Sequence, residues 1–175
     1  MLSLFRKNPA EERARALYAE VATHSRHPAF FTTLEAPDTV EGRFEVLCVN
    51  MYLVLRRLKS ENLAMKDFSQ RVFNAFFKNM DDALREMGVG DMSIGRKIRT
   101  MAEAFYGRVG AYEKAFDDAD ALAEAIARNV YAAEDHPRAA AWVDYAKRAD
   151  DTLSNQDDAA LMSGAITFPA VSAAV

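Results

Sequence analysis

The sequence predicts an all-α protein: a compact single-domain bundle of about six to eight helices. Apolar residues recur every three or four positions in one segment after another, which is the period of an α-helix with one buried face. The signals of strands, sustained two-residue alternation and Asn-Gly or Asp-Gly hairpin turns, are absent. The chain contains only seven glycines and five prolines among its 175 residues, and half of all its residues are hydrophobic. This composition fits a chain that buries a core and not a disordered one.

The first helix is expected within residues 1–28, as part of the same domain as the rest of the chain. Asn8 can cap this helix, and Pro9 suits its first helical position. The helix should end near Pro28, because the residue before a proline disfavours the α conformation. Residues 29–37 are predicted to form an irregular connection.

The second helix is predicted to be the central and most buried one. Asp38 or Thr39 is positioned to cap it. Apolar residues then cover nearly its whole circumference: Phe44, Val46, Leu47, Cys48, Val49, Met51, Leu53, Val54, Leu55 and Leu58. A helix that is apolar all round lies inside a protein. Cys48, the single cysteine, is therefore expected to be a small core side chain and not a reactive thiol.

Two helices are expected in the middle of the chain. The earlier one covers residues 65–87 and is ended by Gly88, because glycine adopts the left-handed conformation without a steric penalty. The later one is expected to be capped by Asp91 or Ser93 and carries apolar residues on one face.

The later of these helices is expected to weaken towards its end. Gly107 and Gly110 disfavour a helix interior, so they should end or bend it. Further helices are predicted over residues 121–131 and from about Pro137 toward Leu153.

The last seventeen residues, Ala159–Val175, carry no charge. Gly164 and Pro169 interrupt them, so this segment does not match the run of about 20 apolar residues that crosses a bilayer. Because soluble monomers avoid large exposed apolar patches, the tail is expected to pack on the body of the protein or on a partner.

The charge of the chain is unevenly distributed. Residues 43–108 contain 12 basic and 8 acidic residues, a net charge of +4, whereas residues 109–175 contain 5 and 12, a net charge of −7. This asymmetry suits either an anionic or membrane-near partner or, equally, ordinary solvated helix faces. No dense basic stripe indicates nucleic-acid binding. Without a secretory signal or a spanning segment, the expected location is the cytoplasm, with or without a peripheral contact with the inner membrane.

No catalytic motif is found, so no catalytic residue, metal ligand or cofactor is predicted. His24 and His27 are the only close histidine pair, but Pro28 ends their helix and no second pair of zinc ligands follows. A solvated helix end is therefore favoured over a metal site.

Several charged or aromatic residues lie beside the apolar stripes, where burial would be costly for folding, and are candidates for binding a partner: Arg43, Arg85, Glu86, Asp91, Tyr106 and Arg108. Arginine and aromatic side chains supply much of the binding energy at protein interfaces. Equally, an arginine among core residues must pair or reach solvent, and Asp38, Glu45, Glu86 or Asp91 could each neutralise one. The sequence leaves these two interpretations open.

Short motifs in a fixed order give the chain a family resemblance. They are Asp38-Thr39, Gly42-Arg43-Phe44-Glu45, Met80-Asp81, Leu84-Arg85-Glu86-Met87-Gly88-Val89-Gly90-Asp91, Tyr106-Gly107-Arg108 and Arg128-Asn129. Over roughly residues 30–165 the chain resembles the ubiquinol–cytochrome c chaperone family. That family is helical, assists assembly of respiratory complex III, and in mitochondria binds newly made cytochrome b before haem insertion is complete.

The resemblance implies that residues 29–175 form a helical chaperone domain of a bacterial relative. Its function would be non-catalytic: holding a protein client, either cytochrome b or another complex III subunit. The alternative from a different class is a helical carrier or enzyme that binds haem or a quinone between helices. An absorption spectrum of the purified protein distinguishes these two functions.

Overall fold

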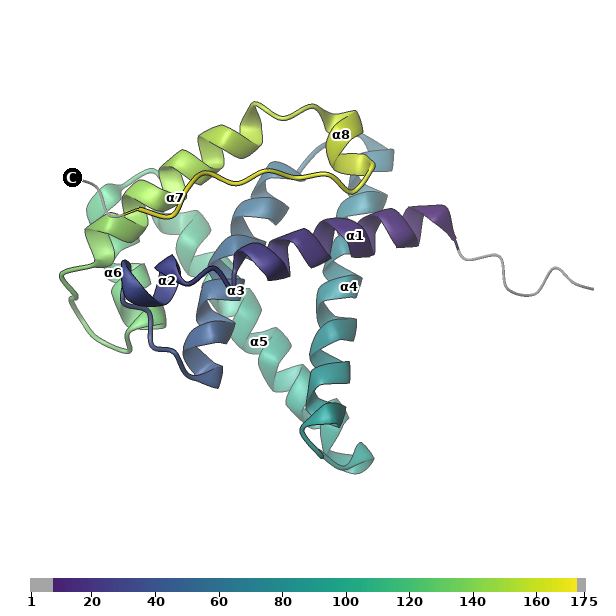
Figure 1. Cartoon of the computed structure of the whole chain (residues 1–175), viewed down its shortest axis with the longest axis horizontal. Coiled ribbons are helices and arrows are strands. Elements are labelled where there is room, and N and C mark those ends of the chain that lie inside the picture. Colours follow the sequence, from purple (N-terminus) through teal and green to yellow (C-terminus); the bar gives the residue numbers. More distant parts are fainter. Residues whose placement is uncertain (1–7, 173–175) are drawn as a thin grey trace, which may run out of the picture.

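Eight helices and no strand make up the part of the chain that the computed structural model describes, residues 8–172 (Figure 1). The helices are α1 (Pro9–His24), α2 (Ala29–Thr32), α3 (Val40–Arg57), α4 (Leu63–Glu86), α5 (Asp91–Ala115), α6 (Ala119–Val130), α7 (Ala139–Ser154) and α8 (Asp158–Met162). The predicted all-α bundle of six to eight helices is confirmed. Asn8 caps α1 as predicted, its side chain accepting a hydrogen bond from the Ala10 amide at 3.1 Å.

Helix α3 is the centre of the bundle, as its apolar circumference predicts. It packs against α1, α5, α6 and α7, and all ten consecutive positions from 45 to 54 are buried. Thr39, one of the two cap candidates, accepts a hydrogen bond from the Gly42 amide at 3.1 Å. A Cβ on Gly42 would lie 1.9 Å from the Pro37 carbonyl oxygen, so the chain can enter α3 only with glycine there. Cys48 is fully buried, as expected, and burial raises the pKa of its thiol.

Helices α4 and α5 form a hairpin whose turn projects from the rest of the molecule (Figure 1). Gly88 has the predicted left-handed conformation, with φ of +81°. The residue that caps α5 was predicted wrongly, because Gly90 occupies the cap position instead of Asp91 or Ser93. Asp91 is already the first helical residue, and its carboxylate is engaged by Arg85 across the turn.

Helix α5 does not end at Gly107 or Gly110, contrary to the sequence expectation. It continues to Ala115, because Phe105 and Tyr112 on its other face are buried in the core and hold the helix by packing. Nothing lies within 4 Å of the position that a Cβ would take at either glycine. Tertiary contacts therefore override the weak helix propensity of the two glycines.

The connection after α1 is more ordered than predicted. Residues 29–32 form the short helix α2, and Phe30 is fully buried, with its ring centroid 5.3 Å from that of Trp142 on α7. An aromatic side chain buried to this depth fixes the backbone around it. The irregular connection is therefore confined to the residues that follow Thr32.

The uncharged tail packs on the body, as predicted, over its described part, Ala159–Ser172; residues 173–175 lie outside the described residues. Leu161 is fully buried in the core. Beyond α8 the chain is extended, and the Gln156 amide both donates to the Thr167 carbonyl and accepts from the Thr167 amide, each at 2.8 Å. The Phe168 ring lies parallel to the ring of His24, with centroids 4.1 Å apart. Side-chain hydrogen bonds and apolar contacts thus hold the segment in place of regular secondary structure.

His24 belongs to a buried chain of hydrogen bonds and not to a solvated helix end. The Asn50 amide nitrogen donates to the Val46 carbonyl at 3.0 Å, which leaves its oxygen to accept from the Tyr145 hydroxyl at 2.5 Å. Because Tyr145 donates there, its oxygen accepts from Nε2 of His24 at 2.8 Å. Burial lowers the pKa of His24 from 6.5 to about 4, since it disfavours the charged ring.

Replacing Met51 with alanine is expected to destabilise the protein by about 2–5 kcal/mol, the range for removing a large side chain from a core. Met51 is fully buried in α3, whereas Val40 in the first turn of the same helix is exposed. Urea unfolding of Met51→Ala and of the control Val40→Ala measures the difference. Equal losses of stability would show that α3 is not central.

Acidification is expected to weaken the fold through His24. Above about pH 6.5 the His24 ring is neutral in both the folded and the unfolded chain, so it does not contribute to the pH dependence of stability there. As pH falls from there toward about 4, the unfolded chain binds a proton that the folded chain excludes, and stability decreases. His24→Phe keeps an aromatic ring against Phe168 and should remove this component, which thermal melts at a series of pH values measure. If the difference in melting temperature between wild type and variant stays constant over this pH range, the pH dependence does not come from His24.

Candidate functional site

The ion pair of Glu45 and Arg108 joins α3 to α5. Glu45 is only 7% exposed, on a helix that is otherwise nearly all apolar. Arg108 donates from Nε and Nη2 to both carboxylate oxygens of Glu45, and from Nη1 to the Ala104 carbonyl at 2.9 Å. A two-point contact of this kind is the strongest form of ion pair and neutralises a carboxylate that could not otherwise stay buried.

Other buried polar groups gather beside this pair. Burial raises the pKa of the Tyr112 hydroxyl, and the charge of Glu45 raises it further. Burial and then the charge of Glu45 act in the same direction on the Cys48 thiol. Both groups therefore stay protonated, so Glu45 and Arg108 carry the only charges in this buried cluster of the described chain.

Arg43 and Arg85 also bind carboxylates of the chain itself. The Arg43 Nε donates to Asp38 at 2.7 Å, which fastens the segment before α3 to its first turn. The Arg85 Nε donates to Asp81 at 2.9 Å, and its Nη1 donates to Asp91 across the α4–α5 turn. These contacts favour the interpretation of the arginines as intramolecular ties, with three of the four carboxylates named from the sequence in the expected role.

Glu86 and Tyr106 are the two candidates that the fold leaves unengaged by ion pairs. Glu86 is exposed and pairs with no cation of the described residues. Tyr106 is 58% exposed on α5, and its ring centroid lies 5.7 Å from that of Phe73 on α4. Tyr106 therefore exposes to solvent an aromatic surface that packing within the protein leaves largely uncovered.

Tyr106 lies in a groove of about 530 Å³ between the end of α3, the loop that follows it, α4 and α5. The apolar part of its lining consists of Leu55, Leu58, Phe73, Phe105, Tyr106 and Val109. The remaining lining residues are polar: Lys59, Ser60, Glu61, Lys66, Ser69 and Gln70. An apolar floor with a polar rim is the composition of surfaces that bind protein segments.

A second hollow, of about 830 Å³, lies between α1 and α4. Most of its charged side chains already pair with one another: Arg71 binds Glu11 at 2.9 Å, and Lys78 binds Asp82. A lining of satisfied ion pairs offers less to a partner than an open apolar floor does, so the groove beside Tyr106 is the better candidate.

Comparison with known proteins decides the family. The model of the ubiquinol-cytochrome C chaperone family matches residues 32–168. The chain belongs to the ubiquinol–cytochrome c chaperone family. The resemblance drawn from the short motifs is thus confirmed, and the protein is a member of a family of complex III assembly chaperones.

Relatives of the chaperone support this membership. Ubiquinol-cytochrome-c reductase complex assembly factor 1 of Xenopus laevis is 26% identical over 145 residues, covering 79% of this chain and 72% of the relative. The mouse protein of the same name is 22% identical over 119 residues, covering 67% of this chain and 40% of its own. The crystal structure of the Cbp3 homolog from Brucella abortus has a TM-score of 0.83 at 36% identity, covering 93% of this chain and 92% of that one.

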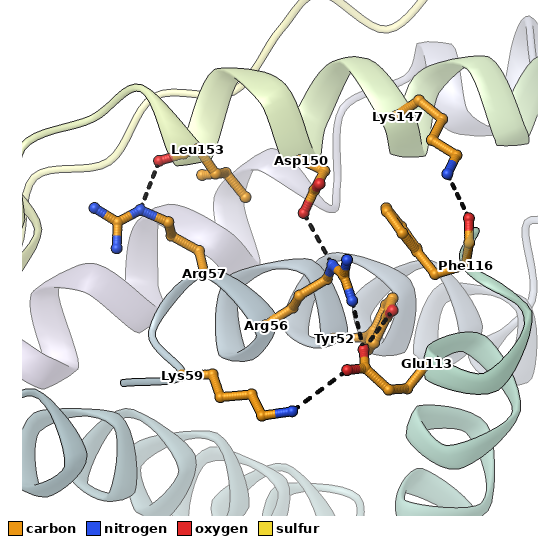
Figure 2. Close-up of polar contacts among 9 residues, drawn as sticks. All are labelled: Tyr52, Arg56, Arg57, Lys59, Glu113, Phe116, Lys147, Asp150 and Leu153. Atoms are coloured by element: carbon orange, nitrogen blue, oxygen red, sulfur yellow. Dashed lines mark hydrogen bonds and ion pairs between the residues drawn. The ribbon is translucent and has the colours of Figure 1, made fainter. Parts of the chain in front are cut away.

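A further polar network of the chaperone, shown in Figure 2, was missed by the sequence analysis. The Arg56 Nη1 donates to Glu113 at 2.8 Å, and its Nε donates to Asp150 at 3.1 Å. The Tyr52 hydroxyl donates to the same Glu113 at 3.0 Å, and Arg56 lies over the ring of Phe116, 4.1 Å from its centroid. Arg56 thus connects α3 to α5 and α7 at the opposite end of α3 from Glu45.

Arg57, the next residue, closes the end of α7. Its Nε donates to the Leu153 carbonyl at 2.8 Å, and its Nη2 donates to the Gln156 carbonyl and to Asp158, each at 2.6 Å. These bonds satisfy carbonyls that a helix end leaves without partners. Two adjacent arginines at the end of an apolar helix were the available signal, but their partners lie 57 to 101 residues away in the sequence and could not be read from it.

Residues 8–172 contain neither a metal-ligand cluster nor a membrane-spanning helix. No group of three or more His, Cys, Asp or Glu side chains in that range is placed to hold a metal ion. None of the helices in the same range combines the length and the apolar character needed to cross a bilayer.

Arg108→Ala is expected to destabilise the chaperone by about 3 kcal/mol or more, because it leaves the buried carboxylate of Glu45 unpaired. Arg43→Ala, which breaks an exposed pair, should cost about 1 kcal/mol or less. Urea unfolding compares the two variants. The double variant Glu45→Met/Arg108→Met should recover much of the loss, since an apolar pair needs no partner. Equal stability of the Arg108 and Arg43 variants would show that Arg108 does not tie α3 to α5.

Proposed function

We propose that this protein is a non-catalytic chaperone that holds a newly made subunit of complex III, and that cytochrome b is this client. It acts in the bacterial cytoplasm, peripheral to the inner membrane in which the client is inserted. The family membership supports the assembly role. The groove beside Tyr106 is the observation that supports a binding mode.

The groove suits a segment of a membrane subunit that has not yet found its final partners. Such a subunit exposes apolar helical surface, which needs a temporary cover outside the finished complex. Phe73 and Tyr106 offer aromatic surface on the floor, and Lys59 and Lys66 stand at the rim. An apolar groove that receives one face of a helix is a recurrent way to recognise a protein segment.

The partner-binding residues proposed from the sequence take two roles in this account. Tyr106 touches the client in the groove, and Glu86 is free to meet it at the end of α4. Arg108 positions Tyr106, since it fixes α5 two residues further along through Glu45. Arg43 holds the entry into α3, and Arg85 with its partner Asp91 holds the α4–α5 turn.

Tyr106→Ala is expected to weaken client binding about thirtyfold, the consequence of losing about 2 kcal/mol at an interface aromatic. The melting temperature should stay near the wild-type value, because the side chain is mostly exposed. Tagged chaperone is titrated against cytochrome b made by cell-free translation in the presence of lipid nanodiscs, and the bound fraction is measured.

Val40→Ala is the matched control, since Val40 is also a large exposed apolar residue and lies outside the groove. Equal weakening by both variants, or none by Tyr106→Ala, would contradict the groove. Preferential capture of a different complex III subunit in a parallel translation would overturn cytochrome b as the client while leaving the groove in place.

A further inference from the structure

The α4–α5 turn presents two methionines to solvent at the point where the hairpin projects from the body (Figure 1). Met87 is 64% exposed and Met92 is 98% exposed. The turn between them is held in shape by Arg85, which binds Asp81 and Asp91, and by the left-handed Gly88. Large apolar side chains that a fixed turn exposes to water do not gain the stabilisation that burial gives. Another surface that covers them would supply it.

Three cationic residues follow Met92 on α5: Arg96, Lys97 and Arg99. All three are exposed, and none lies within ion-pair distance of a carboxylate in the described part of the chain. Residues 92–102 contain these three basic residues and no acidic one.

The acidic residues next to the turn are largely neutralised by ion pairs. Asp82 pairs with Lys78, and Asp81 pairs with Arg85. Asp91 also binds Arg85, so Glu86 is the one carboxylate at the turn without a cation partner among the described residues. Free positive charge therefore belongs to the α5 side.

The exposed methionine and two of the cations share one side of α5. Met92, Arg96 and Arg99 stand at positions i, i+4 and i+7, which lie above one another on a helix. An apolar side chain at the projecting end can enter the headgroup region, and long cationic side chains behind it on the same side can then reach lipid phosphates.

We propose that this α5 surface, Met92 with Arg96, Lys97 and Arg99, docks the chaperone on an anionic lipid bilayer. Met92, with Met87 beside it across the turn, enters the headgroup region, while the cations bind lipid phosphates. Each cation near an anionic membrane surface strengthens binding about fivefold, so three together contribute about a hundredfold.

A bilayer fits this surface better than an acidic protein does. The turn projects from the body (Figure 1), and Met87 and Met92 line neither the groove beside Tyr106 nor the hollow between α1 and α4. The distribution of charge also orients the molecule, since residues 109–175 carry a net charge of −7 and form the end of α5 together with α6, α7 and α8, which lie away from the turn (Figure 1). An anionic membrane repels that side and attracts the turn.

The inference deepens the membrane placement proposed above, and its test contains no client, so the two can fail separately. Wild-type protein is floated with vesicles of phosphatidylcholine containing phosphatidylglycerol, and with vesicles of phosphatidylcholine alone. Binding is expected only to the anionic vesicles and should weaken as salt is added. Arg96→Gln/Lys97→Gln/Arg99→Gln should lower the partition coefficient about a hundredfold. The control Arg13→Gln/Lys114→Gln/Arg128→Gln removes three exposed cations elsewhere and should change it less than fivefold.

Insertion of the methionine is tested separately. Tryptophan fluorescence of Met92→Trp should shift to the blue on anionic vesicles, whereas that of Leu63→Trp, at the exposed opposite end of α4, should not; Trp142 is buried and provides a constant background. Circular dichroism checks that each variant remains helical. Absence of wild-type binding to anionic vesicles, equal losses in the two triple variants, or equal shifts of the two tryptophans would overturn the proposal.

Discussion

Burial of Glu45 is the constraint on which the arrangement of the helices depends. A carboxylate among the apolar residues of α3 cannot remain charged without a partner that satisfies both oxygens, and Arg108 of α5 is that partner. This contact places the middle of α5 against the first turns of α3. Arg56 fixes the other end of α3 to α5 and α7 through Glu113 and Asp150. Because these contacts hold α5 against α3 at two points, they set both the position of the groove beside Tyr106 and the direction in which the α4–α5 turn projects.

The motifs that carry the family resemblance contain three arginines that make ion pairs within the chain. Arg43, Arg85 and Arg108 each bind a carboxylate that belongs to another of the same motifs. The strongest sequence signal therefore marks the scaffold, while the surface for a partner is made of side chains that the scaffold leaves exposed. Tyr106 is the residue at which the two coincide, because it precedes Arg108 by two positions and so points away from the core that Arg108 enters.

Much of the fold could be predicted from local patterns. The burial of α3 follows from its apolar circumference, and the helix stop at Gly88 follows from the conformational freedom of glycine. The course of α5 through Gly107 could not be predicted, because packing of Phe105 and Tyr112 against other helices outweighs a local propensity. The partners of Arg56 and Arg57, and hence the Figure 2 network, arise from helices that meet only after folding. The groove is likewise absent from any single segment, since α3, α4 and α5 each supply part of it.

One side of α5 links the two proposed surfaces. Met92, Arg99 and Tyr106 recur every seven residues and so lie along one side of the helix, with the membrane surface at its start and the groove further along. A chaperone lying on the bilayer by the turn would hold its groove close to a client emerging in that bilayer.

Site-specific photocrosslinking to newly translated cytochrome b tests the central claim most directly, namely that the client occupies the groove and not the scaffold motifs. A photoreactive residue at Gln70 on the groove rim should crosslink to the client, and one at the exposed Glu124 of α6 should not. Crosslinking from Glu124 or from Arg43 in preference to Gln70 would show that the client binds elsewhere.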